Sequence, residues 1–180
     1  MQVVTACNQK YLDDGRLQNL VGSVHHWEPD DVKLIVFYDL GLSEAGKREV
    51  ATWRGVEVRD IPAVVNIGGD GAAKVVPKEA KEATKYAFKP VVIWDALQRS
   101  EAGAVLWIDA GAELRRPLDG IRAVMAKKGH FLIEHPYAFP NRQFHHPQTL
   151  EMLGCSETEA SRQHCATTLV GIVRGSVMER

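Results

Sequence analysis

The chain has 180 residues, of which 45% are hydrophobic and 25% are charged. These values are ordinary for a globular domain and exclude a disordered or low-complexity protein. Its 22 basic and 23 acidic residues give a net charge of -1, which provides no overall attraction to nucleic acid. We therefore expect one domain over residues 1–180 whose partners do not include nucleic acid.

The three cysteines, Cys7, Cys155 and Cys165, form no Cys-x-x-Cys pair. This pattern favours buried free thiols over a disulfide framework or a zinc knuckle. No apolar stretch is long enough to span a membrane, and Met1 leads directly into strand-like sequence instead of an export signal. The sequence as it stands predicts a cytoplasmic protein, and the alternative is the Golgi lumen if the chain is a fragment of a longer precursor.

The first third of the chain alternates between strand-like and helical patterns. Residues 1–6 predict a strand, and apolar residues at i, i+3, i+4 and i+7 over 17–24 predict one face of a helix. A second strand is expected at 32–38, a helix within 43–55 and a short third strand at 56–61. A spacing of about thirty residues between the first two strands is typical of a βαβ unit, so these strands are expected to be parallel neighbours.

Residues 66–73 contain three glycines and no periodic apolar pattern, which predicts a mobile surface loop. The spacing of the glycines does not match a phosphate-binding P-loop. Lys78, Lys81, Lys85 and Lys89 follow at intervals of three or four residues, which on a helix forms a basic stripe that is by default a solvated surface. Lys85 and Lys89 are the better candidates for a local anion site, because they alone are tied to the helix that leads into the next strand.

The rest of the chain continues the alternation. Its expected elements are a helix at 90–97, a strand at 104–109, a helix at 117–125, a strand at 129–134, a short helix at 147–153 and a strand at 167–173. Strands that alternate with helices predict an α/β fold with a mostly parallel, Rossmann-like sheet flanked by helices.

One carboxylate stands at the end of the apolar strand at 104–109 and leads into a turn of small residues. In open α/β sheets, ligands bind beyond the carboxyl ends of such buried strands. Asp109 is therefore the first candidate functional residue. The alternative is that its side chain only caps the turn, because Asp before small residues is common in loops.

Four segments together resemble the nucleotide-sugar glycosyltransferases of the GT-A fold, and most closely the glycogenin-like and related hexosyltransferases. They are the opening Val3-Val4-Thr5-Ala6-Cys7-Asn8 with Tyr11, the segment Lys85-Tyr86-Ala87-Phe88-Lys89-Pro90, the strand end Val105-Leu106-Trp107-Ile108-Asp109-Ala110-Gly111, and Pro117-Leu118-Asp119. In those families a lysine-bearing helix precedes a strand that ends in an Asp-x-Asp motif. The resemblance implies a GT-A-like domain that moves a hexose from a nucleoside diphosphate-sugar to an acceptor hydroxyl.

The resemblance also implies roles for individual residues. Asp109 would hold a divalent cation, Mn²⁺ or Mg²⁺, that neutralises the departing diphosphate. The nucleotide-binding residues would be Thr5, Ala6, Asn8, Tyr11, Lys85, Lys89 and Asp109. The substrate-binding residues would be Gly111, Glu134, His135, Tyr137 and Gln163, with the Tyr137 ring stacking on a sugar.

Two departures from the family pattern keep alternatives open. Gly111 stands where the motif has its second Asp, and the chain ends at Arg180, earlier than these enzymes generally do. The chain is accordingly expected to be either a short GT-A-like domain or one truncated at its C-terminus. The alternative function is a non-catalytic binding or assembly module with the same fold. An unrelated Rossmann-like nucleotide-binding enzyme is disfavoured, because no Gly-x-Gly-x-x-Gly follows the first strand.

Overall fold

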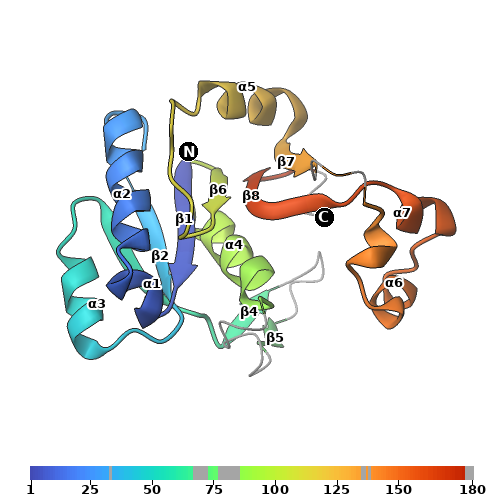
Figure 1. The fold of residues 1–180 in the computed structure, drawn as a ribbon, viewed down its shortest axis with the longest axis horizontal. Coiled ribbons are helices and arrows are strands. Elements are labelled where there is room, and N and C mark those ends of the chain that lie inside the picture. The colour runs from blue at the N-terminus through green and yellow to red at the C-terminus, as the bar shows by residue number, and fades with distance from the viewer. Residues whose placement is uncertain (33, 67–72, 77–85, 135–136, 138, 177–180) are drawn as a thin grey trace.

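The computed structural model describes residues 1–32, 34–66, 73–76, 86–134, 137 and 139–176 (Figure 1). The strands are β1 (Gln2–Cys7), β2 (Ile35–Asp39), β3 (Val56–Asp60), β4 (Val64–Asn66), β5 (Ala73–Val75), β6 (Ala104–Ile108), β7 (His130–Glu134) and β8 (Cys165–Val173). The helices are α1 (Gln9–Asp13), α2 (Arg16–Trp27), α3 (Glu44–Ala51), α4 (Phe88–Arg99), α5 (Asp119–Lys128), η3 (Asn141–Gln143), α6 (Pro147–Met152) and α7 (Glu157–Ser161).

The main sheet has six strands in the order β3-β2-β1-β6-β8-β7. Strands β3, β2, β1 and β6 pair in parallel, whereas β8 runs antiparallel to both of its neighbours. The predicted mostly parallel α/β sheet and the parallel pairing of the first two strands are confirmed. Figure 1 shows α6 and α7 lying beyond the β7–β8 side of this sheet.

Alternation along the strands divides the apolar side chains between two cores, one on each face of the sheet. Val3 and Leu106 belong to the core that α1, α2, α3 and α5 cover, while Val4 and Trp107 belong to the core that α4 covers. Successive side chains of a strand point to opposite faces, so a strand buried on both faces is apolar throughout. Every residue of β1 is buried, as this geometry requires.

Several short elements differ from expectation. The loop predicted at 66–73 is flanked by β4 and β5, which pair antiparallel, and residues 67–72 lie outside the described part of the chain. Helices α1 and α7 have five residues each and were not predicted, because five residues are too few for a periodic apolar signal. The expectation of buried thiols holds for Cys7 and is wrong for the other two cysteines, which are half-buried.

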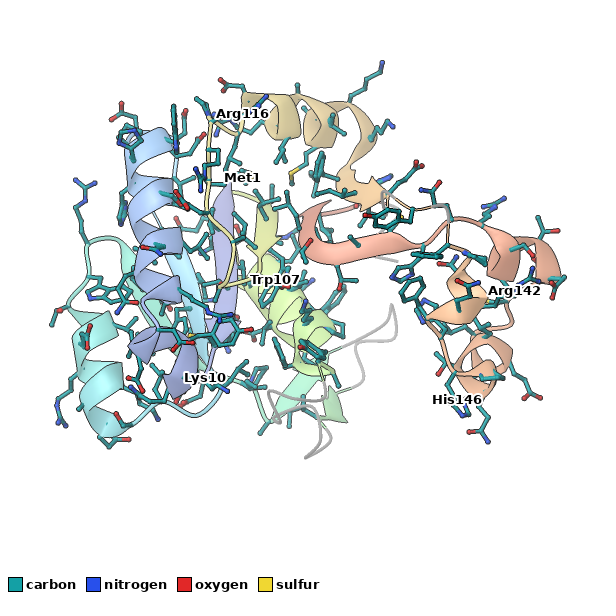
Figure 2. The ribbon with its side chains drawn as sticks, viewed as in Figure 1. Met1, Lys10, Trp107, Arg116, Arg142 and His146 are labelled. Atoms are coloured by element: carbon teal, nitrogen blue, oxygen red, sulfur yellow. The ribbon has the colours of Figure 1, made fainter. Side chains whose placement is uncertain are left out.

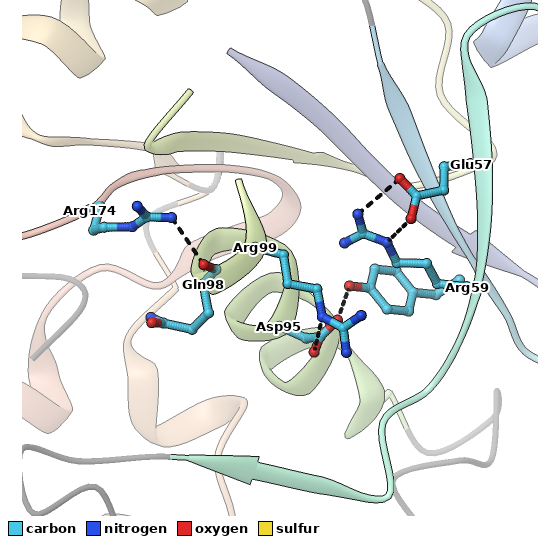
Figure 3. A network of polar contacts seen from close by, with 7 residues as sticks. Glu57, Arg59, Asp95, Gln98, Arg99 and Arg174 are labelled. Carbon is cyan, nitrogen blue, oxygen red and sulfur yellow. Dashed lines mark hydrogen bonds and ion pairs between the residues drawn. The ribbon is translucent and has the colours of Figure 1, made fainter. Parts of the chain in front are cut away.

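Contacts along the C-terminal half of α4 fix this helix to the sheet (Figure 3). The Tyr38 hydroxyl of β2 donates a hydrogen bond of 2.5 Å to Asp95 Oδ2. Burial raises the pKa of Tyr38, so the phenol remains a donor. At the C-terminal end of the helix, the Arg174 guanidinium donates to the carbonyls of Leu97 and Ser100, at 2.6 and 2.7 Å. These carbonyls also accept backbone bonds from the Ser100 and Gly103 N–H groups, so the guanidinium adds a second donor to each and ties the end of α4 to the residue that follows β8.

A buried carboxylate joins the end of α2 to the start of α5. The side chain of Glu28 is 0% exposed, accepts a hydrogen bond from the Leu118 backbone N–H and pairs with Arg122. The same guanidinium also contacts Asp119 on α5. A charge removed from water in this way is tolerated only when it is paired.

We expect Arg122→Ala to lower the free energy of unfolding by about 3 kcal/mol, because the variant leaves the Glu28 carboxylate buried without its cation. Urea denaturation of the purified variant measures this loss. Arg142→Ala is the control, because the ion pair between Arg142 and Glu157 is exposed and such pairs contribute about 0–1 kcal/mol. Equal losses in the two variants would show that the buried pair has no special role.

Candidate functional site

A cavity of about 400 Å³ opens at the carboxyl ends of β1, β2 and β6. It lies where parallel strands of an open α/β sheet present their ligand sites. The predicted cleft at this edge is therefore present. Its lining residues are Ala6, Cys7, Asn8, Tyr11, Leu40, Tyr86, Phe88, Lys89, Trp107, Asp109, Ala110, Gly111, Ala112 and Thr168.

Asp109 is held by the residues around it. Its Oδ1 accepts a hydrogen bond of 2.7 Å from Trp107 Nε1 and lies 2.8 Å from Lys89 Nζ, which is also 3.0 Å from Oδ2. The following turn is closed by the backbone, with the Ala112 N–H donating to the Asp109 carbonyl at 2.8 Å. The side chain is thus engaged by the cavity walls, and the turn does not depend on it as a cap.

Lys89 presents the positive charge of the cavity. It lies in the first turn of α4, and its side chain is only 12% exposed. The ammonium nitrogen lies 5.4 Å from the centre of the Tyr86 ring and 5.7 Å from that of Trp107, and 3.4 Å from the Thr167 carbonyl oxygen. Cation–π contacts of this kind are stronger where water is excluded.

Aromatic rings form much of the cavity wall. Phe88 lies between Tyr86 and Trp107, with ring centres 6.3 and 6.1 Å away. Tyr86 is 63% exposed and adopts a φ of 56°, a left-handed conformation that is uncommon for any residue except glycine. Tyr11 of α1 adds a further ring. Such surfaces stack on planar bases and on sugar rings.

Asn8 provides an unused hydrogen-bond acceptor. It stands at the N-cap of α1, yet its side chain makes no capping bond, and its Oδ1 is buried without a donor among the described residues. The neighbouring Cys7 thiol also lines the cavity, but burial, together with the charge of Asp39, raises its pKa to about 12. A protonated thiol is a poor nucleophile, so Cys7 contributes surface and not covalent chemistry.

The predicted site residues fall into three groups. Those that line the cavity are Ala6, Asn8, Tyr11, Lys89, Asp109 and Gly111. Thr5 is fully buried within β1, Glu134 ends β7, and Tyr137 and Gln163 lie in the segment between β7 and β8, so these four are not among the lining residues. Figure 2 shows Trp107 near the centre of the molecule and Arg142 and His146 out on that segment. Lys85 and His135 lie outside the described residues.

Several lining residues were not predicted. Strand patterns in the sequence could have indicated some of them, whereas others reach the cavity only through tertiary packing. Trp107 stands two residues before Asp109 in one strand, so alternation alone places both side chains on the same face. Leu40 follows β2, whose end meets the ends of β1 and β6 at the same edge. Tyr86 and Thr168 reach the cavity through the packing of α4 and β8, which no local pattern indicates.

No family model matches the chain, and the search of curated proteins gives no match. Solved structures do match, and the three named next each cover 96% of this chain. They include the galactosyltransferase LgtC (15% identity, TM-score 0.54, 58% of its chain covered), the bifunctional glycosyltransferase WbbM (11%, 0.57, 31%) and mouse xyloside xylosyltransferase 1 (8%, 0.53, 67%). The fold is GT-A-like. At these identities the likeness concerns the fold alone, and the chain spans little more than half of LgtC.

A divalent cation would find few ligands from the protein. Among the residues that the structure describes, no group of three His, Cys, Asp or Glu side chains is placed to hold a metal ion. Asp109 is the one acidic side chain among the described residues that line the cavity, and Lys89 already pairs with it. Mg²⁺-type sites often combine one or two carboxylates with substrate phosphates. The donor set therefore fits a cation whose remaining ligands come from a bound diphosphate and water.

The described helices include none that is both long and apolar enough to cross a membrane.

Proposed function

We propose that residues 1–180 form one domain that binds a nucleoside diphosphate-sugar in the cavity and transfers its hexose to an acceptor hydroxyl. The observation that carries this proposal is the ion pair of Lys89 and Asp109 in an aromatic-walled cavity at the carboxyl end of β6. The same general fold occurs in LgtC, which was solved in complex with donor and acceptor sugar analogs. The pair supplies one group for an anion and one for a cation, which a diphosphate with its counterion requires.

The nucleoside is assigned to the part of the cavity near α1. Asn8 Oδ1 can accept a hydrogen bond from a base N–H or a ribose hydroxyl, because no described donor occupies it. The rings of Tyr11 and Tyr86 provide stacking surfaces at the same cavity. Thr5 is fully buried within β1, next to Ala6, and is not among the described lining residues, so we propose that it supports this region from beneath.

The diphosphate is assigned to Lys89 and Asp109. A lysine ammonium is a compact charge on a flexible stem, so Lys89 can turn from Asp109 to a phosphate oxygen. Asp109 is then available, with the phosphate oxygens, to hold Mn²⁺ or Mg²⁺. Such a cation would neutralise the charge that develops on the leaving diphosphate.

The acceptor is assigned to the side of the cavity that faces β8 and β7. Thr168 of β8 lines the cavity there. Gly111 lines the cavity near Tyr11, because a Cβ built on it would lie 3.6 Å from Tyr11 Cε1. Glu134 pairs in register with Cys165, at the start of the same β8 strand. We propose that Glu134, His135, Tyr137 and Gln163 contact the acceptor hydroxyl or its sugar.

A thermal-shift panel tests the proposal directly. UDP, GDP, ADP and CDP, and a sugar conjugate of each, are compared with and without Mn²⁺. We expect one nucleoside diphosphate to raise the melting temperature, with a larger shift when Mn²⁺ is present, because a ligand that binds only the folded state stabilises it. A panel without any shift would overturn the proposal.

Asn8→Ala is expected to weaken binding of the selected nucleoside diphosphate by about 3- to 10-fold, the effect of one neutral hydrogen bond. Isothermal titration calorimetry measures this affinity. Inorganic pyrophosphate, which has no base or ribose, serves as the matched ligand control, and its affinity should not change. Equal weakening for both ligands would place Asn8 at the phosphates and contradict the assignment.

The alternative function is a module that binds a nucleotide-sugar without turning it over. Gly111 in place of a second acid favours this alternative, because one carboxylate gives a weaker cation site than two. Release of free nucleoside diphosphate, as the hexose passes to an added acceptor hydroxyl or to water, separates the two functions. Release supports the transferase, and tight binding without release supports the module.

A further inference from the structure

A second groove, of about 360 Å³, lies between α2 and the segment that follows β6. It shares no lining residue with the cavity described above. Its walls carry amide, hydroxyl, imidazole, indole and carboxylate groups. The lining residues are Gln18, Asn19, Gly22, Ser23, His26, Trp27, Glu113 and Leu114. We infer that this groove binds a neutral saccharide at a place separate from the proposed donor site.

The floor of the groove contains a glycine that the fold does not require. Gly22 lies inside α2, and a Cβ built there would meet no heavy atom within 4 Å. Glycine is unfavourable in the interior of a helix, and most other residues would stabilise α2. A bare backbone has a use where a ligand must approach the helix closely. Gly22 therefore gives a ring-shaped ligand access to the floor of the groove.

The groove is held open by contacts of its own. Ser23 Oγ donates to the Leu20 carbonyl at 2.8 Å and accepts from the Leu114 backbone N–H at 3.0 Å, which fastens the segment after β6 to α2. The Trp27 ring is 36% exposed, and the His26 ring packs against it edge-on, with ring centres 4.9 Å apart. The bond from Leu114 therefore holds the segment after β6 against α2, and a partly exposed indole ring lies at the end of α2.

The hydrogen-bonding groups of the groove suit hydroxyls. Gln18 Oε1 is buried and accepts no bond from any described donor. Asn19 and Glu113 add further acceptors. Neither lysine nor arginine is among the described lining residues, and the Glu113 carboxylate is paired with Arg115 at 3.2 Å. The groove therefore presents no unpaired positive charge among these residues for a phosphate or another anion. A neutral ligand with many hydroxyl donors and an apolar ring face matches these groups, and the volume falls in the usual range for small-molecule sites.

The test is a titration of the ¹⁵N-labelled chain with glucose, galactose, N-acetylglucosamine and lactose, followed by ¹H–¹⁵N correlation spectra. We expect at least one sugar to shift the Gly22 amide and the Trp27 indole N–H signals in a saturable manner. Gly22→Leu should weaken this binding at least tenfold, because its side chain fills the groove. UDP binding measured on the same variant should not change. Loss of sugar binding at the groove can therefore be distinguished from loss of nucleotide binding in the cavity.

Gly120→Leu is the matched control. Gly120 is also a helical glycine, on α5, whose added Cβ would meet open space, and it does not line the groove. Both variants replace glycine with a better helix former, so both are expected to fold. The inference is overturned if no sugar shifts the two signals, or if Gly22→Leu binds sugar as well as Gly120→Leu does. Sugar-induced shifts at Asn8 and Trp107 in place of Gly22 would overturn it as well.

Discussion

Lys89→Ala is expected to change nucleotide and metal affinity in opposite directions. Without metal, the variant should bind the nucleoside diphosphate about 10- to 100-fold more weakly, since a charged hydrogen bond contributes about 1.5–3 kcal/mol. With nucleotide present, Mn²⁺ should bind more tightly, because the ammonium that lies 2.8 Å from Asp109 Oδ1 no longer competes for the carboxylate. Calorimetry with each ligand alone and with both together measures the two changes.

Lys128, Lys78 and Lys81 serve as controls for this variant. Lys128 is exposed at the end of α5, so Lys128→Ala should leave both affinities unchanged. The sequence further predicts that Lys78→Ala and Lys81→Ala are neutral, whereas Lys85→Ala weakens nucleotide binding as Lys89→Ala does. If alanine at each of these positions leaves nucleotide affinity unchanged, the lysine stripe is a solvated surface and not an anion site.

Asp109→Ala is expected to abolish nucleotide-dependent metal binding, since it removes the only carboxylate among the lining residues. Gly111→Asp should strengthen metal binding by restoring a second acid. The backbone at this position accepts a side chain, because a Cβ on Gly111 would lie 3.6 Å from Tyr11 Cε1, an ordinary contact. Calorimetry with Mn²⁺ and nucleoside diphosphate provides the comparison.

Two checks accompany this pair of variants. Asp109→Ala leaves Lys89 without its partner, so circular dichroism must first show that the variant is folded. Asp109→Asn, which keeps an oxygen for Trp107 Nε1 and removes the charge, separates loss of the cation ligand from loss of packing. If the unmodified chain and Asp109→Ala bind metal and nucleotide equally well, Asp109 is a structural residue and the proposed site is wrong.

Periodicity predicted the elements that are long and buried. Strands β1, β2 and β6 were recognisable because a strand covered on both faces is a continuous apolar run. The hairpin of β4 and β5 was missed, because its strands have three residues each and alternation cannot be detected over that length. The antiparallel direction of β8 depends on how the chain returns to the sheet after α7, and no local pattern indicates it.

The candidate site was predicted where residues follow the ends of strands. Asp109 and Asn8 come directly after β6 and β1, so the topology of the sheet brings them to one edge. The contact between Lys89 and Asp109 was not predicted. These residues are 20 positions apart, and their distance depends on how α4 packs against β6. The sequence predicted a phosphate as the partner of Lys89 and a metal ion as the partner of Asp109, whereas the two residues pair with each other.

The ion pair of Lys89 and Asp109 determines the net charge that the cavity presents to a ligand. With ammonium and carboxylate joined, the walls present nearly balanced charge, so a lone phosphate must compete with Asp109 and a lone metal ion must compete with Lys89. Under the proposed function, a diphosphate that arrives together with its cation replaces both halves of the pair at once, so that neither Lys89 nor Asp109 is left without an opposite charge. The proposed site would then bind each ion more tightly when the other is present, which is a reciprocal coupling between nucleotide and metal.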